Sequence, residues 1–110
     1  MAAKVKEIQT VEEFNALIFS GKKVVASFYA DKCGSCKTIG PKFEKLAAVK
    51  EYAKIQFVKV NIDKLPDIAK KFVVTATPTF HAFKNGLKVD TLIGAVPAKL
   101  DALVEKLSKL

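Results

Sequence analysis

Two apolar runs before and just after the midpoint of the chain predict buried strands. Residues 23–29 are β-branched and aromatic, and residues 55–62 repeat this character after a gap long enough for a helix. Nearly continuous apolar runs of this length are typical of central strands covered on both faces. Strand, helix, strand forms a βαβ unit, so we expect parallel strands with a right-handed crossover.

Apolar residues at helical spacing mark the helices. Thr10 and Glu13 form a capping box, in which each side chain satisfies a free N–H at the start of the first helix. Proline at the first turn opens a short helix over residues 66–72 and a last helix that begins at Pro97. The apolar faces of the three longer helices are Phe14, Leu17 and Ile18; Ile39, Phe43, Leu46 and Ala47; and Leu100, Leu103, Val104 and Leu107.

The helix that follows residue 33 contains a proline. Its apolar positions extend it to about Val49 or Tyr52. Pro41 lies inside this span, where it removes one backbone hydrogen bond and bends the helix. The first turn is therefore expected to point in a different direction from the packed remainder.

A hairpin completes the pattern in the second half of the chain. Asn85-Gly86, the strongest short hairpin signal present, separates a strand that follows Pro78 from a strand over residues 88–93, so these two should be antiparallel. A short edge-like strand over residues 5–8 precedes the first helix. The element order β-α-β-α-β-α-β-β-α predicts an α/β fold.

Length and composition place the chain among globular proteins. Its 110 residues, of which 50% are hydrophobic, suffice for a single domain over 1–110 with one core. No run of about 18 apolar residues could cross a membrane, and the N-terminal residues lack the apolar run of a secretory signal. We therefore expect a cytoplasmic protein with no membrane contact.

The charge is strongly positive but does not indicate nucleic-acid binding. The formal net charge is +8, and all nineteen basic residues are lysines scattered along the chain. Arginine, which supplies bidentate contacts to phosphate and guanine, is absent from the sequence. The excess charge should instead favour acidic partner proteins and make association sensitive to salt.

Only two cysteines are present, Cys33 and Cys36, and they lie between a buried strand and a helix start. The first sulfur of such a pair meets unpaired N–H groups and the positive end of the helix dipole, which favour a thiolate. Cys33 is therefore the better nucleophile. Cys36, one turn further, can attack a mixed disulfide on Cys33 and release the partner reduced.

Other interpretations of this pair remain open. A structural disulfide would close a very short loop and constrain the unfolded chain little. A metal site is not expected, because zinc would need two more ligands and only His81 offers an imidazole. Inert core cysteines would fit a buried segment, whereas Gly34 and Ser35 favour an exposed turn. His81 itself we interpret as a structural residue.

The whole pattern resembles the thioredoxin family from about residue 5 to the end of the chain. The motif with two cysteines alone is only moderately specific, and the resemblance rests on several segments together. These are Phe28-Tyr29-Ala30, Cys33-Gly34-Ser35-Cys36-Lys37, Pro41, Val60-Asn61-Ile62-Asp63, Pro78-Thr79-Phe80, Lys84-Asn85-Gly86 and Gly94-Ala95.

The resemblance implies a thioredoxin fold, in which a central mixed five-stranded sheet is flanked by four helices. It implies reduction of protein disulfides by Cys33 and Cys36, with no bound cofactor and with electrons from an NADPH-dependent, flavin-containing thioredoxin reductase. It also implies a cis peptide before Pro78 and a groove where Thr77 pairs its backbone with substrate. Gly94 and Ala95 would form the other lip. We expect a monomer or a weak dimer.

Three departures from the family pattern concern the cysteines. Lys32 stands where most members have tryptophan, and Ser35 stands where they have proline; both should favour the Cys33 thiolate, so we expect a more oxidising redox couple. Ser27 replaces the buried aspartate that helps deprotonate the second cysteine. Lys59, without that carboxylate partner, should be desolvated and could accept the Cys36 proton, or else reach solvent and leave the proton to water.

Two other functions remain possible on this pattern. The chain could be a binding module with the same fold, in which weakened redox chemistry is incidental and the basic surface holds an acidic partner. It could also be a dedicated oxidant or isomerase, which would share the site and differ in redox potential.

Overall fold

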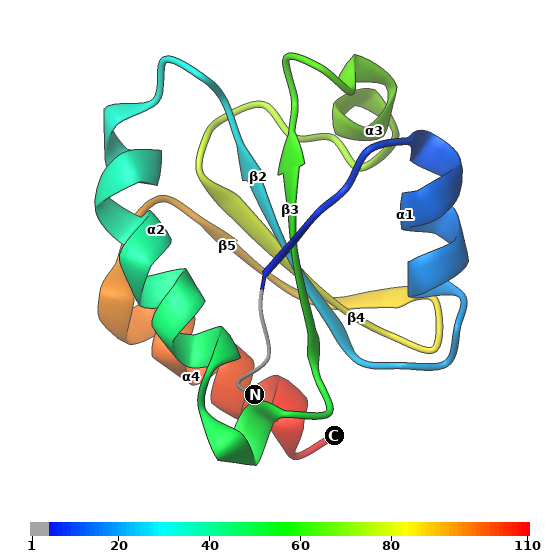
Figure 1. Ribbon diagram of the computed structural model, residues 1–110, viewed down its shortest axis with the longest axis vertical. Helices are drawn as coiled ribbons and strands as arrows, with labels where there is room; N and C mark the ends of the chain where they lie inside the picture. The colour runs from blue at the N-terminus through cyan, green and yellow to red at the C-terminus, as the bar shows by residue number, and fades with distance from the viewer. Residues whose placement is uncertain (1–4) are drawn as a thin grey trace.

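A five-stranded sheet of order β1-β3-β2-β4-β5 forms the middle layer of the molecule (Figure 1). The structure, a computed structural model, describes residues 5–110. β1 and β2 run parallel to β3, β4 runs antiparallel to β2, and β5 runs antiparallel to β4, which confirms the expected mixed sheet. The strands are β1 (Lys6–Glu7), β2 (Val24–Tyr29), β3 (Gln56–Asn61), β4 (Thr79–Lys84) and β5 (Leu87–Ile93).

Four α-helices cover the two faces of the sheet in pairs (Figure 1). α1 and α3 lie on one face, and α2 and α4 lie on the other. This arrangement confirms the α/β fold with four flanking helices. The helices are α1 (Val11–Ile18), α2 (Gly34–Ala47), α3 (Pro66–Lys71) and α4 (Pro97–Ser108), with a 3₁₀ turn η1 (Lys50–Tyr52) after α2.

Each face of the sheet carries its own apolar core, because successive side chains of a strand point to opposite sides. Under α1 and α3, the Phe14 ring meets Phe28, Phe72 and Phe83 edge-on, with ring centroids 5.4 to 6.0 Å apart. Under α2, Phe43 packs on Phe57 and Phe80. The second core supports the helix that begins at the two cysteines.

The ends of several elements differ from the sequence-based expectation, most of them by one residue, and β1 and α2 are the examples with a clear cause. β1 contains only Lys6–Glu7, although the Ile8 N–H also donates to the Lys59 carbonyl at 2.9 Å. α2 ends at Ala47 because Val49 is extended (φ −72°, ψ 127°), and the chain resumes as the separate turn η1. Residues 1–4, part of the segment that we expect to carry no secretory signal, lie outside the described residues.

The local turn signals are largely confirmed. Asn85 and Gly86 both have positive φ, 53° and 80°, as a two-residue type I′ hairpin requires. The Thr10 hydroxyl accepts the Glu13 N–H at 3.0 Å. The Glu13 carboxylate, however, accepts from the N–H of Gln9 rather than from that of Thr10, so the capping box is displaced by one residue.

Candidate active site

The two cysteines lie where the carboxyl end of β2 passes into α2. Cys33 is the N-cap of α2, with extended backbone (φ −116°, ψ 102°), and the helix starts at the next residue, Gly34. The cysteines form a disulfide with their Cα atoms 5.2 Å apart. A disulfide at the first turn of a helix is placed for reversible opening, because the helix N-terminus favours the thiolate that opening releases.

The Cys33 sulfur has hydrogen-bond donors around it. The Cys36 N–H donates to Cys33 Sγ at 3.1 Å, and the Ser35 hydroxyl oxygen lies 3.6 Å from the same sulfur. Lys32, which directly precedes Cys33, is exposed, as are Gly34 and Ser35. The Cys36 N–H and the Ser35 hydroxyl are therefore the groups placed to donate hydrogen bonds to a thiolate at Cys33.

The two sulfurs differ in their surroundings. Cys33 is 8% exposed, whereas Cys36 is half-buried and borders a cavity of about 270 Å³ beneath α2. Cys33 is not among the residues that line this cavity. Its wall includes Ser27, Tyr29 and Lys59 from the sheet and Lys37, Gly40 and Glu44 from α2.

A polar row crosses the sheet below this cavity. Glu7 on β1 is in register with Lys59 on β3, and Lys59 is in register with Ser27 on β2. Residues in register on adjacent strands point to the same face. Ser27 is 9% exposed, so the small side chain that stands in the place of the family's aspartate is buried at the floor of the cavity.

The expectation that Lys59 lacks a carboxylate partner and is desolvated is wrong. Its Nζ lies 3.8 Å from Glu7 Oε1, and its side chain is 39% exposed. The carboxylate comes from the neighbouring edge strand rather than from β2. The long Lys59 side chain therefore reaches solvent, as our other interpretation proposed.

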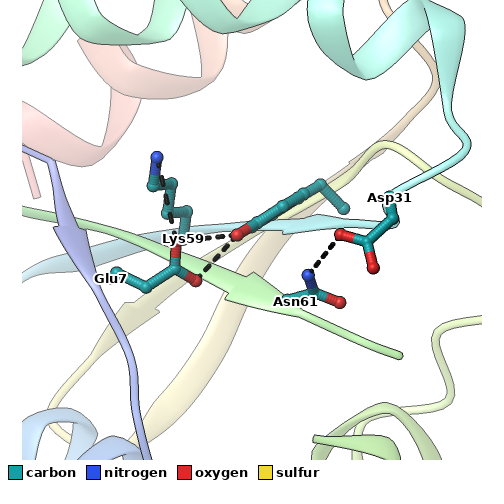
Figure 2. Close-up of polar contacts among 5 residues, drawn as sticks. Glu7, Asp31, Lys59 and Asn61 are labelled. Atoms are coloured by element: carbon teal, nitrogen blue, oxygen red, sulfur yellow. Dashed lines mark hydrogen bonds and ion pairs between the residues drawn. The ribbon is translucent and has the colours of Figure 1, made fainter. Parts of the chain in front are cut away.

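Tyr29 joins this row through its hydroxyl, which donates to the two Glu7 oxygens at 2.7 and 2.8 Å. Figure 2 shows the Glu7 carboxylate with Lys59 reaching it from the next strand. Lys59 Nζ also lies 5.9 Å from the centre of the Tyr29 ring. Burial, together with the hydrogen bond and the charge of Glu7, raises the pKa of Tyr29 to about 12, so the hydroxyl keeps its proton at neutral pH.

A second polar cluster fixes the loop that carries the cysteines. Asn61 Nδ2 donates to Asp31 Oδ1 at 2.9 Å, as Figure 2 shows, and the Asp31 N–H donates to Asp63 Oδ2 at 3.1 Å. Asn61 Oδ1 in turn accepts the Asp63 N–H at 2.9 Å. The residues after β2 and those after β3 therefore hold each other in place beside the disulfide.

The sheet register brings the expected substrate groove to the same edge. Phe28 pairs with Thr79, and Thr79 pairs with Ile93, so the segments next to these residues meet at one end of three strands. The Thr77–Pro78 peptide is cis, as the resemblance implies, and the Pro78 carbonyl accepts the Gly94 N–H at 2.9 Å.

The remaining residues expected to form the groove are Gly94, Ala95 and Thr77. Gly94 has φ 107°, a conformation that glycine adopts without strain. Ala95 is half-buried and packs on the core beneath α2 and α4, whereas Thr77 precedes the first paired residue of β4. The backbone of Thr77 therefore lies outside the ladder between β4 and β5.

The single histidine belongs to the core. His81 is 3% exposed; its Nδ1 lies 2.8 Å from the Thr91 hydroxyl and its Nε2 lies 3.3 Å from the Phe72 carbonyl. Because a carbonyl only accepts, Nε2 carries the proton and Nδ1 accepts from Thr91. Burial lowers the pKa of His81, so the neutral form is favoured.

Sequence reasoning missed two members of the site, Glu7 and the Tyr29 hydroxyl. A signal was present, because a lysine in the middle of the apolar run of β3 requires an oppositely charged or polar neighbour. The register between β1 and β3 decides which residue that is. Among residues 5–110, no group of three or more histidine, cysteine, aspartate or glutamate side chains is placed to hold a metal, and no helix is long and apolar enough to cross a membrane.

Comparison with known proteins agrees with this geometry. The thioredoxin family model matches residues 5–109. Thioredoxin from Coprinus comatus is 41% identical over 102 residues, which are 93% of this chain and 96% of that protein. The crystal structure of Malassezia sympodialis thioredoxin superimposes with a TM-score of 0.93 at 39% identity, covering 98% of this chain and 95% of that one.

A further similar structure comes from work on the thiol resolving mechanism of yeast mitochondrial 1-Cys peroxiredoxin via glutathione/thioredoxin systems; it has a TM-score of 0.85, 37% identity and coverage of 93% of this chain and 94% of that one. The family match spans nearly all of the chain, and the site holds a disulfide at the first turn of a helix. The chain therefore belongs to the thioredoxin family and is a protein disulfide reductase whose redox-active pair is Cys33 and Cys36.

Proposed function

We propose that Cys33 is the attacking sulfur and Cys36 the resolving one. The Cys33 thiolate attacks one sulfur of a substrate disulfide and expels the other as a thiolate. Cys36, after losing its proton, attacks Cys33 Sγ, closes the protein disulfide and releases the second substrate sulfur. The observation that carries this assignment is the N-cap position of Cys33, whose sulfur accepts the Cys36 N–H at 3.1 Å.

Insulin reduction with dithiothreitol tests this assignment. The unchanged protein should accelerate precipitation of the insulin B chain, and Cys33→Ser should bring the rate to that of dithiothreitol alone. A Cys33→Ser variant that retains the activity would contradict the role of Cys33. Failure of the unchanged protein to accelerate the reaction would favour the interpretation as a binding module.

We propose that the Cys36 proton leaves through the cavity. Cys36, Tyr29 and Lys59 line the same space, and Glu7 lies directly behind the last two. The Tyr29 hydroxyl already donates to Glu7, so it can take up a proton from cavity water while passing its own to the carboxylate. Glu7 would then perform from β1 the task that an aspartate at position 27 performs in most family members.

We propose that the groove formed by Thr77, Pro78, Gly94 and Ala95 holds an extended segment of the substrate. The position of Thr77 just before the paired part of β4 supports this, because its backbone can add a short strand of hydrogen bonds. The disulfide lies at the same end of the sheet. Recognition would then depend on the main chain of the substrate more than on its side chains.

We propose an NADPH-dependent thioredoxin reductase as the electron donor, and peroxiredoxin-like proteins among the disulfide substrates. The basic surface should favour acidic partners, and the protein should act as a monomer or weak dimer. A lone Cys-x-x-Cys pair suits a reducing compartment, which supports the cytoplasm. Coupling to NADPH oxidation through a purified thioredoxin reductase tests the donor, and cell fractionation tests the compartment.

We propose a couple more oxidising than that of family members with Cys-Gly-Pro-Cys. Lys32 and the Ser35 hydroxyl, 3.6 Å from Cys33 Sγ, stabilise the reduced thiolate more than the disulfide. Ser35→Pro should therefore lower the reduction potential, as measured by equilibration with a glutathione redox buffer. A potential that rises, or does not move, would contradict the role of Ser35.

A further inference from the structure

The cavity beside Cys36 is open because two of the residues that line it are small. It touches Cys36 and not Cys33, and its floor is the Ser27 side chain, where a larger acidic residue would occupy part of the space. On its other wall is Gly40, at which an added Cβ would meet no atom within 4 Å. Two small residues, Ser27 on the sheet and Gly40 on α2, therefore leave open a space that borders the second cysteine.

The lining of the cavity carries charges of both signs. Lys37 and Lys59 supply ammonium groups, and Asp31 and Glu44 supply carboxylates. Its volume, about 270 Å³, is at the lower limit of small-ligand sites, which span roughly 300 to 1,000 Å³, and a folded protein substrate cannot enter it. The occupant that fits is a small zwitterion that carries both carboxylate and ammonium groups.

Cys36, which borders this cavity, carries the sulfur at which attack is chemically favoured. Displacement at a disulfide sulfur is faster when the expelled sulfur is the better thiolate. Attack on Cys36 expels Cys33, whose negative charge is stabilised by the Cys36 N–H and the N-terminus of α2. In such a displacement the attacking and leaving sulfurs lie on opposite sides of the sulfur under attack. The cavity borders Cys36 without bordering Cys33, so a thiol in the cavity would approach Cys36 from a side that Cys33 does not occupy.

We propose that the cavity is an entry site through which a zwitterionic low-molecular-weight thiol, of the cysteine or glutathione class, reduces the protein at Cys36. The small thiolate bonds to Cys36 Sγ, the disulfide breaks, and Cys33 leaves as a thiolate. A second small thiolate attacks the small-molecule sulfur of this mixed disulfide and releases the oxidised small disulfide. Cys36 departs as a thiolate and takes a proton from cavity water. Two thiols are oxidised and one protein disulfide is reduced.

This inference rests on the proposed function only in taking Cys33–Cys36 as the redox centre. It concerns how the oxidised protein is reduced again, whereas attack on protein substrates by Cys33 takes place at the groove. The protein would thus have two faces for exchange, one for polypeptides and one for small thiols.

Mapping the first adduct tests the proposal directly. Oxidised protein is mixed with glutathione, quenched with acid within milliseconds, alkylated and digested, and the glutathione-bearing cysteine is identified by mass spectrometry. The expected early product carries glutathione on Cys36 and the alkyl group on Cys33. Glutathione on Cys33 at the earliest time point would overturn the proposal.

Two matched pairs of variants test the cavity itself. Gly40→Leu fills the space, whereas Ala48→Leu adds the same side chain at an exposed position at the end of α2. The reduction rate with glutathione should fall at least about tenfold in the first variant, equivalent to about 1.4 kcal/mol, and stay within twofold in the second. Equal rates in the two variants would overturn the proposed route.

Lys37→Gln removes a cavity charge, and Lys45→Gln removes one exposed charge elsewhere on α2. Lys37→Gln should slow reduction by cysteine severalfold and leave reduction by neutral 2-mercaptoethanol unchanged, whereas Lys45→Gln should alter neither. Equal effects of both variants would exclude charge recognition in the cavity. Insulin reduction, measured on the same preparations, separates this inference from the proposed function. If the protein reduces insulin but glutathione is found on Cys33, only this inference is overturned. If the protein does not reduce insulin but glutathione is found on Cys36, only the proposed function is overturned.

Discussion

The two cysteines of the disulfide are surrounded by different kinds of groups. On the Cys33 side the Cys36 N–H donates to the sulfur, and the segment proposed to bind substrate is held by a backbone bond from the Gly94 N–H to the Pro78 carbonyl; the Ser35 hydroxyl is a side-chain group near the sulfur. On the Cys36 side the surrounding groups are side chains, with Ser27 at the floor of the cavity and Glu7 behind it. Backbone groups are kept by the fold whatever the sequence, whereas a side-chain environment can be replaced one residue at a time. Both sides depart from the family pattern through side chains, at Lys32 and Ser35 beside Cys33 and at Ser27 on the Cys36 side.

The largest effect should come from removing the sulfur on the side-chain side. In Cys36→Ser, Cys33 still attacks a substrate disulfide, but nothing resolves the adduct. The rate in the insulin assay should fall to that of dithiothreitol alone, as when a group of a covalent mechanism is lost. When the reduced variant is mixed with insulin in the absence of dithiothreitol, a stable mixed disulfide on Cys33 should accumulate and be visible by non-reducing electrophoresis. Rapid turnover without accumulation would show that the two sides are not divided in this way.

A smaller effect should follow from restoring the family's carboxylate. Ser27→Asp places an acceptor at the floor of the cavity, where it can take the Cys36 proton directly. Resolution of the mixed disulfide should become faster at neutral pH, by about tenfold, and its pH profile should shift to lower pH. Ser27→Asn is the control of equal shape that cannot accept a proton in this range. Identical pH profiles for the two variants would show that proton removal from Cys36 does not depend on position 27.

The hydrogen bond between Tyr29 and Glu7 gives a spectroscopic prediction. Burial and Glu7 raise the pKa of Tyr29 to about 12, so Glu7→Gln should lower that pKa by removing the negative charge, while the effect of burial remains. Ultraviolet titration of tyrosinate measures the change. Tyr52, whose pKa is also raised mainly by burial, is the internal control, because Glu7 does not contribute to its shift. An unchanged Tyr29 titration would remove Glu7 from the site.

The smallest effect concerns His81, which belongs to neither side of the site. Burial lowers its pKa below the ordinary 6.5 in the folded state, so the unfolded chain binds the proton more readily. The stabilisation that comes from burying neutral His81 is therefore complete above about pH 6.5, and the free energy of unfolding decreases as the pH falls below that value. The melting temperature should decrease less between pH 7.5 and 5 in His81→Gln than in the unchanged protein, and insulin reduction at pH 7.5 should be the same in both. An equal pH dependence of melting would rule out this origin.

The sequence predicts the elements of the fold better than the contacts of the site. Apolar runs and the signals at Asn85-Gly86 and Pro97 are local, so they locate strands, hairpin and last helix without the folded structure. The Glu7–Lys59 pair joins residues that are far apart in the chain, and it depends on the register of a two-residue strand that no local pattern fixes. Apolar spacing predicts a longer α2 than the structure has, because the extended backbone at Val49 ends the helix.

The cavity could not be predicted for a different reason. It exists because Ser27 on β2 and Gly40 on α2 are both small and face the same space. Ser27 stands out in the sequence only as a departure from the family pattern, and Gly40 gives no signal of its own. A cavity forms between two surfaces that pack against each other, so the sequence of neither segment alone predicts it.

The position of β1 determines how persistently Glu7 is held beside Tyr29. This strand is two residues long, lies at the outer edge of the sheet and contributes Glu7. Segments of this kind open by local unfolding at far lower free energy than the centre of a domain, so brief detachment of the chain's beginning would carry the carboxylate away from Tyr29 while the disulfide stayed in place. Hydrogen exchange at the Ile8 amide, which is bonded to Lys59, would report how often that happens.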